Sequence, residues 1–233
     1  MLRESRLHRE KHFYGSYMSP YLRIEALSRS ERQIVARLTT PNKIQNFLDE
    51  IDYSIEETNR CPLQVLRDRM ANCFDGAVFA AAMLRRLGYP PLILDLLPNS
   101  RDDDHVVALY KRDRHWGAVA KSNFAGLRFR EPIYRTVREL VMSYFEQYYN
   151  VDREKTLRAY TRPLNLQVFD KYQWMTRNET MERIEQRLSK MRPVPLLTRR
   201  MIAGLSAVDE RSCKAGLLGA NKAGLYKPQH KTR

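Results

Sequence analysis

The amino-acid sequence predicts an α+β fold in which N-terminal helices pack on a small antiparallel sheet and additional helices follow toward the C-terminus. Between residues 41 and 88, apolar side chains recur at the spacing of amphipathic or buried helices. Between residues 92 and 121 the pattern changes to short runs rich in branched residues, which is typical of strands. A chain of 233 residues with 43% hydrophobic residues can bury a core without disulfides or a metal. We therefore expect one domain with extensions.

The first predicted helices are recognised by the residues at their N-termini. Ser30 with Gln33 forms a capping-box pattern that opens a short helix through residue 38. Thr40 followed by Pro41 supplies the N-cap and the first position of a second helix. The apolar residues of this second helix fall on one stripe: Ile44, Phe47, Leu48, Ile51 and Ile55. Pro62 starts a further short helix, which we expect to end near residue 70.

The segment 73–88 is predicted to be a helix buried on most sides. Asn72 is a favourable N-cap, the interior is rich in alanine and almost wholly apolar, and Gly88 ends the helix. Cys73 lies in the first turn of this helix. There, unpaired backbone N–H groups and the helix dipole favour a negative charge on sulfur.

A strand and then a hairpin are predicted after this helix. The strands cover residues 92–97, 105–111 and 116–121, and the last two are joined by the polar turn 112–115. His105 is the first residue of the middle strand.

Two helices are predicted in the C-terminal half. Thr136 with Glu139 is a capping-box pattern, and the helix that it opens ends near Asn150. A second helix covers residues 178–191 and carries one apolar face. Beyond residue 197 the sequence has small residues and many lysines without a strong period, so we expect weak order or a docked extension.

These patterns divide the chain into four parts. The first 20 residues lack an extended periodic pattern. The predicted parts are a loosely ordered N-terminal arm (1–20), a core (21–150), a helical C-terminal extension (151–198) and a basic tail (199–233). The formal net charge is +14, and the tail contributes eight Lys or Arg residues against two acidic ones.

Composition narrows the class of protein. No apolar run approaches the roughly 18 to 20 residues that cross a bilayer, and the first ten residues are too charged for a signal peptide. We therefore expect a cytoplasmic protein without a membrane partner. Cys61, Cys73 and Cys213 are an odd number of cysteines and too few for a disulfide framework, so each is expected to serve packing or chemistry.

Cys73 and His105 satisfy the sequence requirements of thiol catalysis. This chemistry needs an accessible thiolate, an imidazole within hydrogen-bonding reach, and a third group that fixes the imidazole tautomer. Cys73 begins a buried helix, and His105 begins a strand that can reach the end of that helix. Asn123, just after the neighbouring strand, is the candidate for the third group, with Ser122 as the alternative because adjacent strand residues point to opposite faces.

This stretch resembles the core of the transglutaminase-like superfamily, a branch of the papain fold. The resemblance rests on Cys73, Asp75, the alanine-rich helix ending at Gly88, His105, and Trp116 eleven residues after it. It covers roughly residues 44–124 and implies a papain/transglutaminase-like core. The family's acidic residue falls four positions after the tryptophan, at Ala120 in this chain, so Asn123 is expected to substitute. The resemblance also implies that the backbone N–H of Cys73 contributes to the oxyanion hole.

The function implied is cysteine-dependent acyl transfer on a peptide or protein amide. We expect Cys73 to act as nucleophile, His105 as general acid and base, and Asn123 as the group that orients the imidazole. Hydrolysis is favoured over cross-linking. The alternative is a catalytically silent scaffold that binds a peptide, or that binds nucleic acid or another polyanion through the basic tail.

No cofactor or metal is expected. Three adjacent carboxylates, Asp102, Asp103 and Asp104, precede a strand without the spacing of a calcium loop and are expected to form a solvated loop. Their charge beside His105 is expected to raise the pKa of the imidazole. His8 and His12 have the spacing of two metal ligands on a helix, but no third ligand is near them in the sequence.

Overall fold

The computed structural model describes residues 27–226 and is a mixed α/β structure built around one antiparallel sheet. This confirms the predicted α+β class. The predicted arm 1–20, with His8 and His12, lies outside the described residues. None of the helices in residues 27–226 has the length and apolar content needed to span a membrane.

Three short helices precede the central one: α1 (Arg29–Arg37), α2 (Pro41–Glu50) and α3 (Pro62–Asp68). The caps of α2 and α3 lie where the sequence predicts them, but the expected capping box of α1 is wrong. Ser28 is the N-cap of α1, and its hydroxyl accepts a hydrogen bond from the N–H of Glu31. The Glu31 carboxylate accepts a hydrogen bond from the Ser28 N–H at 2.6 Å, which completes this capping box. A charged carboxylate is a stronger acceptor than the Gln33 amide of the predicted box.

Helix α2 ends earlier than the apolar stripe predicts. Ile51 is already extended, and β1 (Asp52–Tyr53) pairs in parallel with β2 (Met70–Ala71). Ile55 therefore lies outside the helix and is 59% exposed. The buried ammonium of Lys121 donates to the Leu48 and Ile51 carbonyl oxygens at 2.7 and 2.5 Å, which satisfies the last turn of α2 from outside the helix.

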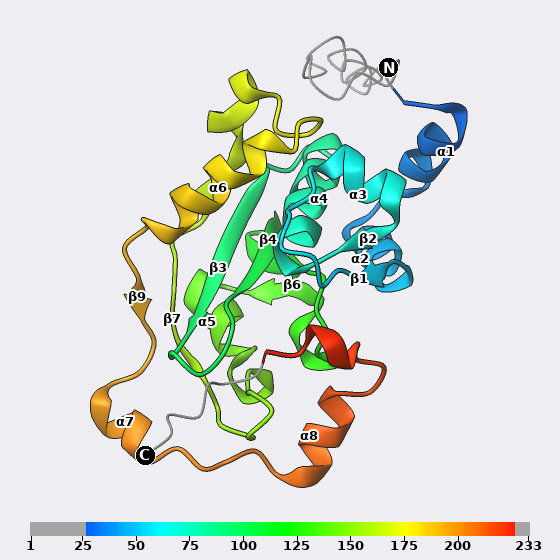
Figure 1. Cartoon of the computed structure of the whole chain (residues 1–233). Helices are drawn as coiled ribbons and strands as arrows, with labels where there is room; N and C mark the ends of the chain where they lie inside the picture. Colours follow the sequence, from blue (N-terminus) through cyan, green and yellow to red (C-terminus); the bar gives the residue numbers. More distant parts are fainter. Residues whose placement is uncertain (1–26, 227–233) are drawn as a thin grey trace, which may run out of the picture.

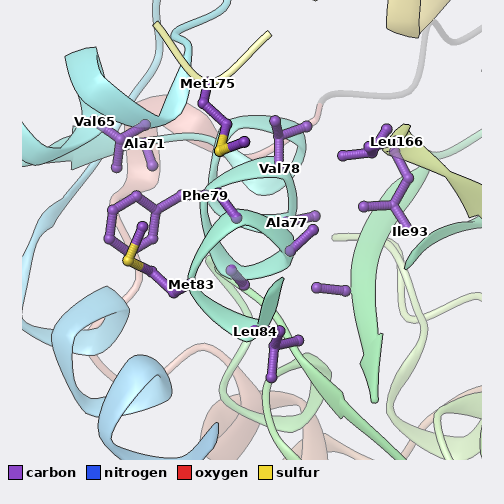
Figure 2. Packing of buried hydrophobic residues seen from close by; sticks show 14 of the residues in the cluster. Val65, Ala71, Ala77, Val78, Phe79, Met83, Leu84, Ile93, Leu166 and Met175 are labelled. Carbon is purple, nitrogen blue, oxygen red and sulfur yellow. The ribbon is translucent and has the colours of Figure 1, made fainter. Parts of the chain in front are cut away.

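Helix α4 (Cys73–Arg86) is the buried helix that the sequence predicts. Asn72 and Asp75 form its capping box, and the residues from Phe74 to Leu84 are all buried. Figure 2 shows side chains from several segments around it, including Val65 of α3 on one side and Leu166 on the other. Because α4 is enclosed, its N-terminus, with Cys73, is held by the surrounding elements.

The sheet has seven strands, and only β3, β4 and β5 were expected from the sequence. The strands are β3 (Leu92–Pro98), β4 (His105–Arg112), β5 (His115–Val119), β6 (Arg130–Tyr134), β7 (Leu157–Tyr160), β8 (Leu164–Asn165) and β9 (Val194–Pro195). Their order is β6-β5-β4-β3-β7-β9, and β8 also pairs with β3. The predicted hairpin turn is confirmed, and Asp113 and Arg114 both adopt positive φ, as a two-residue turn of type I′ requires.

Each face of the sheet carries its own core. Alternate residues such as Ile93 and Val106 pack on the side of α4, and their neighbours Leu94 and Val107 pack on the opposite side. The opposite face is covered by α5 (Val137–Met142), which is shorter than predicted. The chain leaves α5 and passes through η3 (Phe145–Gln147), and Tyr144 and Tyr148 are buried beside the sheet.

The segment 151–198 returns to the sheet. It contains β7, β8 and β9 in addition to the predicted helix, α6 (Glu179–Ser189), and η4 (Leu166–Tyr172). Met181, Ile184 and Leu188 of α6 are buried, as its apolar face predicts.

The tail contains further short helices: α7 (Arg199–Ala203), α8 (Glu210–Gly216) and η5 (Lys222–Gly224). The Tyr149 hydroxyl donates to the Ser212 carbonyl oxygen at 2.9 Å and holds α8 against the body. Figure 1 shows the orange and red end of the chain folding back toward β1. Of the two expectations for this region, the docked extension is therefore the one found through residue 226.

Gly76 is required where α4 passes Lys121, just after β5. A Cβ atom at Gly76 would collide with the Cβ of the buried Lys121 and lie 3.4 Å from its Cα. We predict that Gly76→Ala lowers the free energy of unfolding by about 1–3 kcal/mol, the usual cost of overpacking a core. Urea denaturation measures this loss. Gly204→Ala is the control, since its Cβ would meet nothing closer than 3.7 Å. Equal stability of the two variants would contradict the prediction.

Candidate active site

Cys73 is held at the first turn of α4 by the capping box. The Asn72 side chain accepts from the Asp75 N–H at 2.8 Å, and the Asp75 carboxylate accepts from the Asn72 N–H at 3.4 Å. In an α-helix each N–H binds the carbonyl oxygen four residues earlier, and the first N–H groups have no such carbonyl within the helix. Cys73 is the first residue of α4, so its N–H has no partner of this kind. This N–H is therefore in a position to serve as an oxyanion donor.

The thiol of Cys73 lies against the start of β4. It donates to the backbone carbonyl oxygen of Asp104, with an Sγ···O distance of 3.9 Å. Cys73 and His105 line the same small cavity, whose volume is about 60 Å³. The structure therefore brings the two predicted residues to one site from segments 32 residues apart, as their numbers in the chain show.

The imidazole of His105 is 4% exposed and has a single defined orientation. Its Nε2 lies 2.8 Å from the carbonyl oxygen of Leu127. A carbonyl oxygen only accepts hydrogen bonds, so Nε2 carries the proton in the neutral ring and Nδ1 is the basic nitrogen. This is the tautomer that a general base needs if Nδ1 is to take a proton from a thiol.

Arg130 fixes the loop that presents this carbonyl. Its guanidinium donates to the Gly126 oxygen at 2.7 Å and to the Ser143 hydroxyl at 2.9 Å, and it lies 3.9 Å from the centre of the Tyr144 ring. These contacts tie η2 (Ala125–Leu127) to β6 and to the end of α5. The orientation of His105 thus depends on an arginine that is itself stacked and multiply hydrogen-bonded.

Asn123 also lines the cavity, but its amide does not bind His105 in this structure. Its Nδ2 donates to the Asn221 carbonyl oxygen at 2.8 Å, and its Oδ1 accepts from the Asn221 N–H at 2.7 Å. The alternative, Ser122, accepts from the Phe124 N–H at 3.0 Å. The orienting bond expected from Asn123 or Ser122 is therefore made by the Leu127 carbonyl, because η2 folds over the ring.

Burial keeps both reactive groups neutral in this state. Burial, with a smaller contribution from the nearby charge of Arg130, lowers the pKa of His105 to about 4, although the bond to the Leu127 carbonyl acts in the opposite direction. Burial also raises the pKa of the Cys73 thiol far above its usual value, and the negative charges of Asp104, Asp103 and Asp95 add to this rise. The expectation that Asp102–Asp104 raise the pKa of the imidazole is thus wrong. The charges of Asp103 and Asp104 act instead on the sulfur of Cys73, where they oppose the thiolate.

Asp95 is a buried acidic residue near the site that the sequence analysis missed. It lies in the apolar strand β3 and is 3% exposed, and its Oδ1 has no hydrogen-bond partner among the described residues. Burial raises its pKa, and the charge of Asp104 and a hydrogen bond with it raise it further. The sequence does contain a sign of this residue, because Asp95 interrupts the apolar run Leu-Ile-Leu-Asp-Leu-Leu. Ionisable residues are seldom fully buried unless they are paired.

Tyr148 is a second residue that the sequence did not assign. Its hydroxyl lies 2.7 Å from the Asp103 carbonyl oxygen and 3.1 Å from that of Leu96. Its ring packs edge-on to His105, with 6.5 Å between the ring centres. Tyr148 therefore holds the acidic loop beside β3 and forms one wall of the imidazole pocket.

The other cysteines lie away from this site. Cys61 is the buried N-cap residue of α3, and its N–H donates to the Asn178 side chain at 2.8 Å. Cys213 lies in α8. Among residues 27–226, no group of three or more His, Cys, Asp or Glu side chains has an arrangement that holds a metal ion.

No protein-family model matches the sequence, and no curated protein matches it. Among solved structures, calcium-bound LapG of Legionella pneumophila aligns with 15% identity and a TM-score of 0.33, over 40% of this chain and 60% of LapG. The EGTA-treated form aligns with 14% identity and a TM-score of 0.32, over 40% and 59% of the two chains. The chain thus spans less than two thirds of LapG, and a likeness at this level does not establish a shared fold.

We predict that Asp95→Asn changes how stability depends on pH. The folded pKa of Asp95 is raised, so above about pH 4 the unfolded state loses this proton before the folded state does, and stability falls as pH rises. The gain in unfolding free energy of the variant over the wild type should grow with pH, by up to about 1.4 kcal/mol per unit. Urea denaturation at several pH values measures it. The exposed turn substitution Asp113→Asn should show no such trend. A pH-independent difference for Asp95→Asn would contradict the prediction.

We predict that Arg130→Met shifts the titration of His105 upward from its midpoint near pH 4. The substitution removes a positive charge, which favours the imidazolium, whereas loosening the Leu127 carbonyl bond would disfavour it, so an upward shift reports the charge. Nitrogen NMR shifts of the imidazole report the tautomer and the midpoint. Arg112→Met, at the exposed end of β4, is the control. An unchanged midpoint in Arg130→Met would contradict the charge effect, and an unchanged tautomer would remove the positioning role of Arg130.

Proposed function

We propose that the chain is a cysteine-dependent acyl-transfer enzyme of transglutaminase-like type that hydrolyses a peptide or protein amide. Cys73 is the nucleophile, His105 is the general acid and base, and the Leu127 carbonyl holds the imidazole. The observation that carries the proposal is the His105 tautomer: the 2.8 Å bond from Nε2 leaves Nδ1 as a base in the cavity that also contains the thiol. A buried helix headed by cysteine and packed on an antiparallel strand headed by histidine also supports this class.

In the first half of the reaction, the thiol proton passes to Nδ1 of His105 and Sγ of Cys73 attacks the carbonyl carbon of the amide. The developing oxyanion is stabilised by the N–H of Cys73 and the positive end of α4. The imidazolium then protonates the amide nitrogen, the C–N bond breaks, and a thioester remains on Cys73.

In the second half, His105 removes a proton from water, and the hydroxyl oxygen attacks the thioester carbon. The C–S bond breaks, the carboxylic acid leaves, and the thiol regains its proton. Water is proposed as the acceptor, in preference to an amine that would give a cross-link. The alternative of a silent scaffold that binds a polyanion rests on bulk charge alone.

We predict that Cys73 is acylated by p-nitrophenyl acetate and that this acylation depends on His105. An activated ester removes the need to know the natural amide. Mass spectrometry should locate an acetyl thioester on Cys73, and His105→Ala should lower the acylation rate by at least about 100-fold, as loss of a general base does. His115→Ala, at the start of β5 beside the hairpin turn, should leave the rate unchanged. Acetylation at other side chains only, or equal rates in the wild type and His105→Ala, would overturn the proposal.

A further inference from the structure

The C-terminal segment Asn221–Tyr226 lies in the cleft at the candidate active site. Gly224 and Tyr226 line the cavity that contains Cys73 and His105. Residues 218–220, immediately before this segment, and Asn221 at its start line a larger adjoining cavity of about 760 Å³. The two cavities share Tyr53, Ser122 and Asn123. A stretch of the protein's own chain thus occupies the approach to the thiol.

Asn123 holds this segment by its main chain. Its side-chain amide accepts from the Asn221 N–H and donates to the Asn221 carbonyl oxygen, as a neighbouring strand would. Gln45 makes the same pair of bonds with the main chain of Ala120, at 3.0 and 2.9 Å, inside the core. The Gln45 pair is a fixed part of the fold, but the Asn123 pair is at the surface and holds a terminal segment. Such a contact recognises any residue that has a backbone N–H.

The cleft also selects for glycine. A Cβ atom at Gly224 would lie 3.0 Å from two carbons of the Tyr53 ring and 3.2 Å from the Ile55 side chain. The only described glycines with positive φ are Gly88 and Gly219, so the backbone of Gly224 does not itself require glycine. A side chain at position 224 would need Tyr53 or Ile55 to shift by a few tenths of an ångström, so the preference for glycine there is steric and comes from the cleft.

The larger cavity has a mixed lining, with the acidic side chains of Asp49, Glu50, Asp52 and Glu56 beside those of Lys121 and Arg128. The segment is also tethered, because Gly216 of α8 packs directly on the Tyr149 hydroxyl. Phe124 stacks edge-on against the same tyrosine, with 5.6 Å between ring centres. A tether of this kind keeps the local concentration of the segment high.

We propose that residues 221–226 are a resident pseudosubstrate, and that the cleft binds an extended peptide through its main chain at Asn123 and takes glycine against Tyr53. Asn123 is then a positioning residue for the substrate main chain. The segment must leave before a substrate reaches Cys73, and its departure removes part of the burial that keeps the thiol neutral. The naming of the substrate class rests on the proposed function, whereas occupancy of the cleft does not.

The first test compares Asn221→Pro with Asn221→Ala by the rate at which iodoacetamide alkylates Cys73, located by mass spectrometry. Proline fits the Asn221 φ of −72° but removes the N–H that Asn123 binds. Alanine keeps the N–H and removes only the side chain, which caps the Ala223 N–H in the wild type. We expect Asn221→Pro to raise the rate by about tenfold or more and Asn221→Ala to stay near the wild type. Equal rates in all three proteins would overturn the proposal.

The second test displaces the segment at a different contact and then supplies it as a peptide. Gly224→Val should accelerate the alkylation of Cys73, and Gly204→Val, at the C-cap of α7 with no neighbour closer than 3.7 Å, should not. The hexapeptide of residues 221–226 should then protect Cys73 in the Gly224→Val protein, whereas the same peptide with valine in place of glycine should not. Combining Asn123→Ala with Gly224→Val should reduce the protection. Failure of the native peptide to protect would overturn the proposal.

These measurements separate the inference from the proposed function. Alkylation and protection report occupancy of the cleft and need no turnover. If the opened variants bind the hexapeptide but form no thioester with p-nitrophenyl acetate, the proposed function fails and the pseudosubstrate assignment stands. If Cys73 acylates through His105 but Asn221→Pro and Gly224→Val leave its alkylation unchanged, the enzyme assignment stands and the pseudosubstrate fails.

Discussion

The buried carboxylate of Asp75 ties the reactive end of α4 to the chain around it. It accepts hydrogen bonds from the backbone N–H groups of Arg60 and Asn72, and it lies 3.9 Å from the Arg60 guanidinium. Burial raises its pKa to about 6, so near neutral pH it carries a charge that these donors must stabilise. Arg60 in turn binds Glu56 and Asp68. One carboxylate thus closes the helix cap and fixes the segment before α3, and the position of Cys73 depends on both.

The same burial that orders the site also favours the neutral forms of Cys73 and His105. Burial disfavours the charged forms of both the thiol and the imidazole, and the charges of Asp104, Asp103 and Asp95 disfavour the thiolate further. Part of the enclosure comes from Gly224 and Tyr226, which are the last described residues of the cavity wall. The electrostatics of the site and the docking of the tail are therefore linked, because solvent that enters when the segment leaves would favour charge on both reactive groups.

The fold assembles this site from segments that are distant in the chain. The helix of Cys73 packs on one face of the sheet, while the partners of His105, Leu127 and Tyr148, belong to the core on the other face. His105 is the first residue of β4, so it lies at the end of the strand, where residues from both packed faces of the sheet approach it. The strands β7 and β9 extend the sheet beyond β3, so the C-terminal half completes the platform on which the site is built.

The sequence by itself determined the local features: the N-termini of α2, α3, α4 and α5, the hairpin turn and the buried helix. These depend on residues close in the chain, where spacing and capping chemistry act directly. Tertiary structure decided what distant contacts control. Short strands such as β8 and β9 lack a pattern of their own, Ile55 left its helix because β1 pairs with β2, and a backbone carbonyl rather than Asn123 orients the imidazole. A main-chain oxygen has no residue type, so no sequence pattern identifies it.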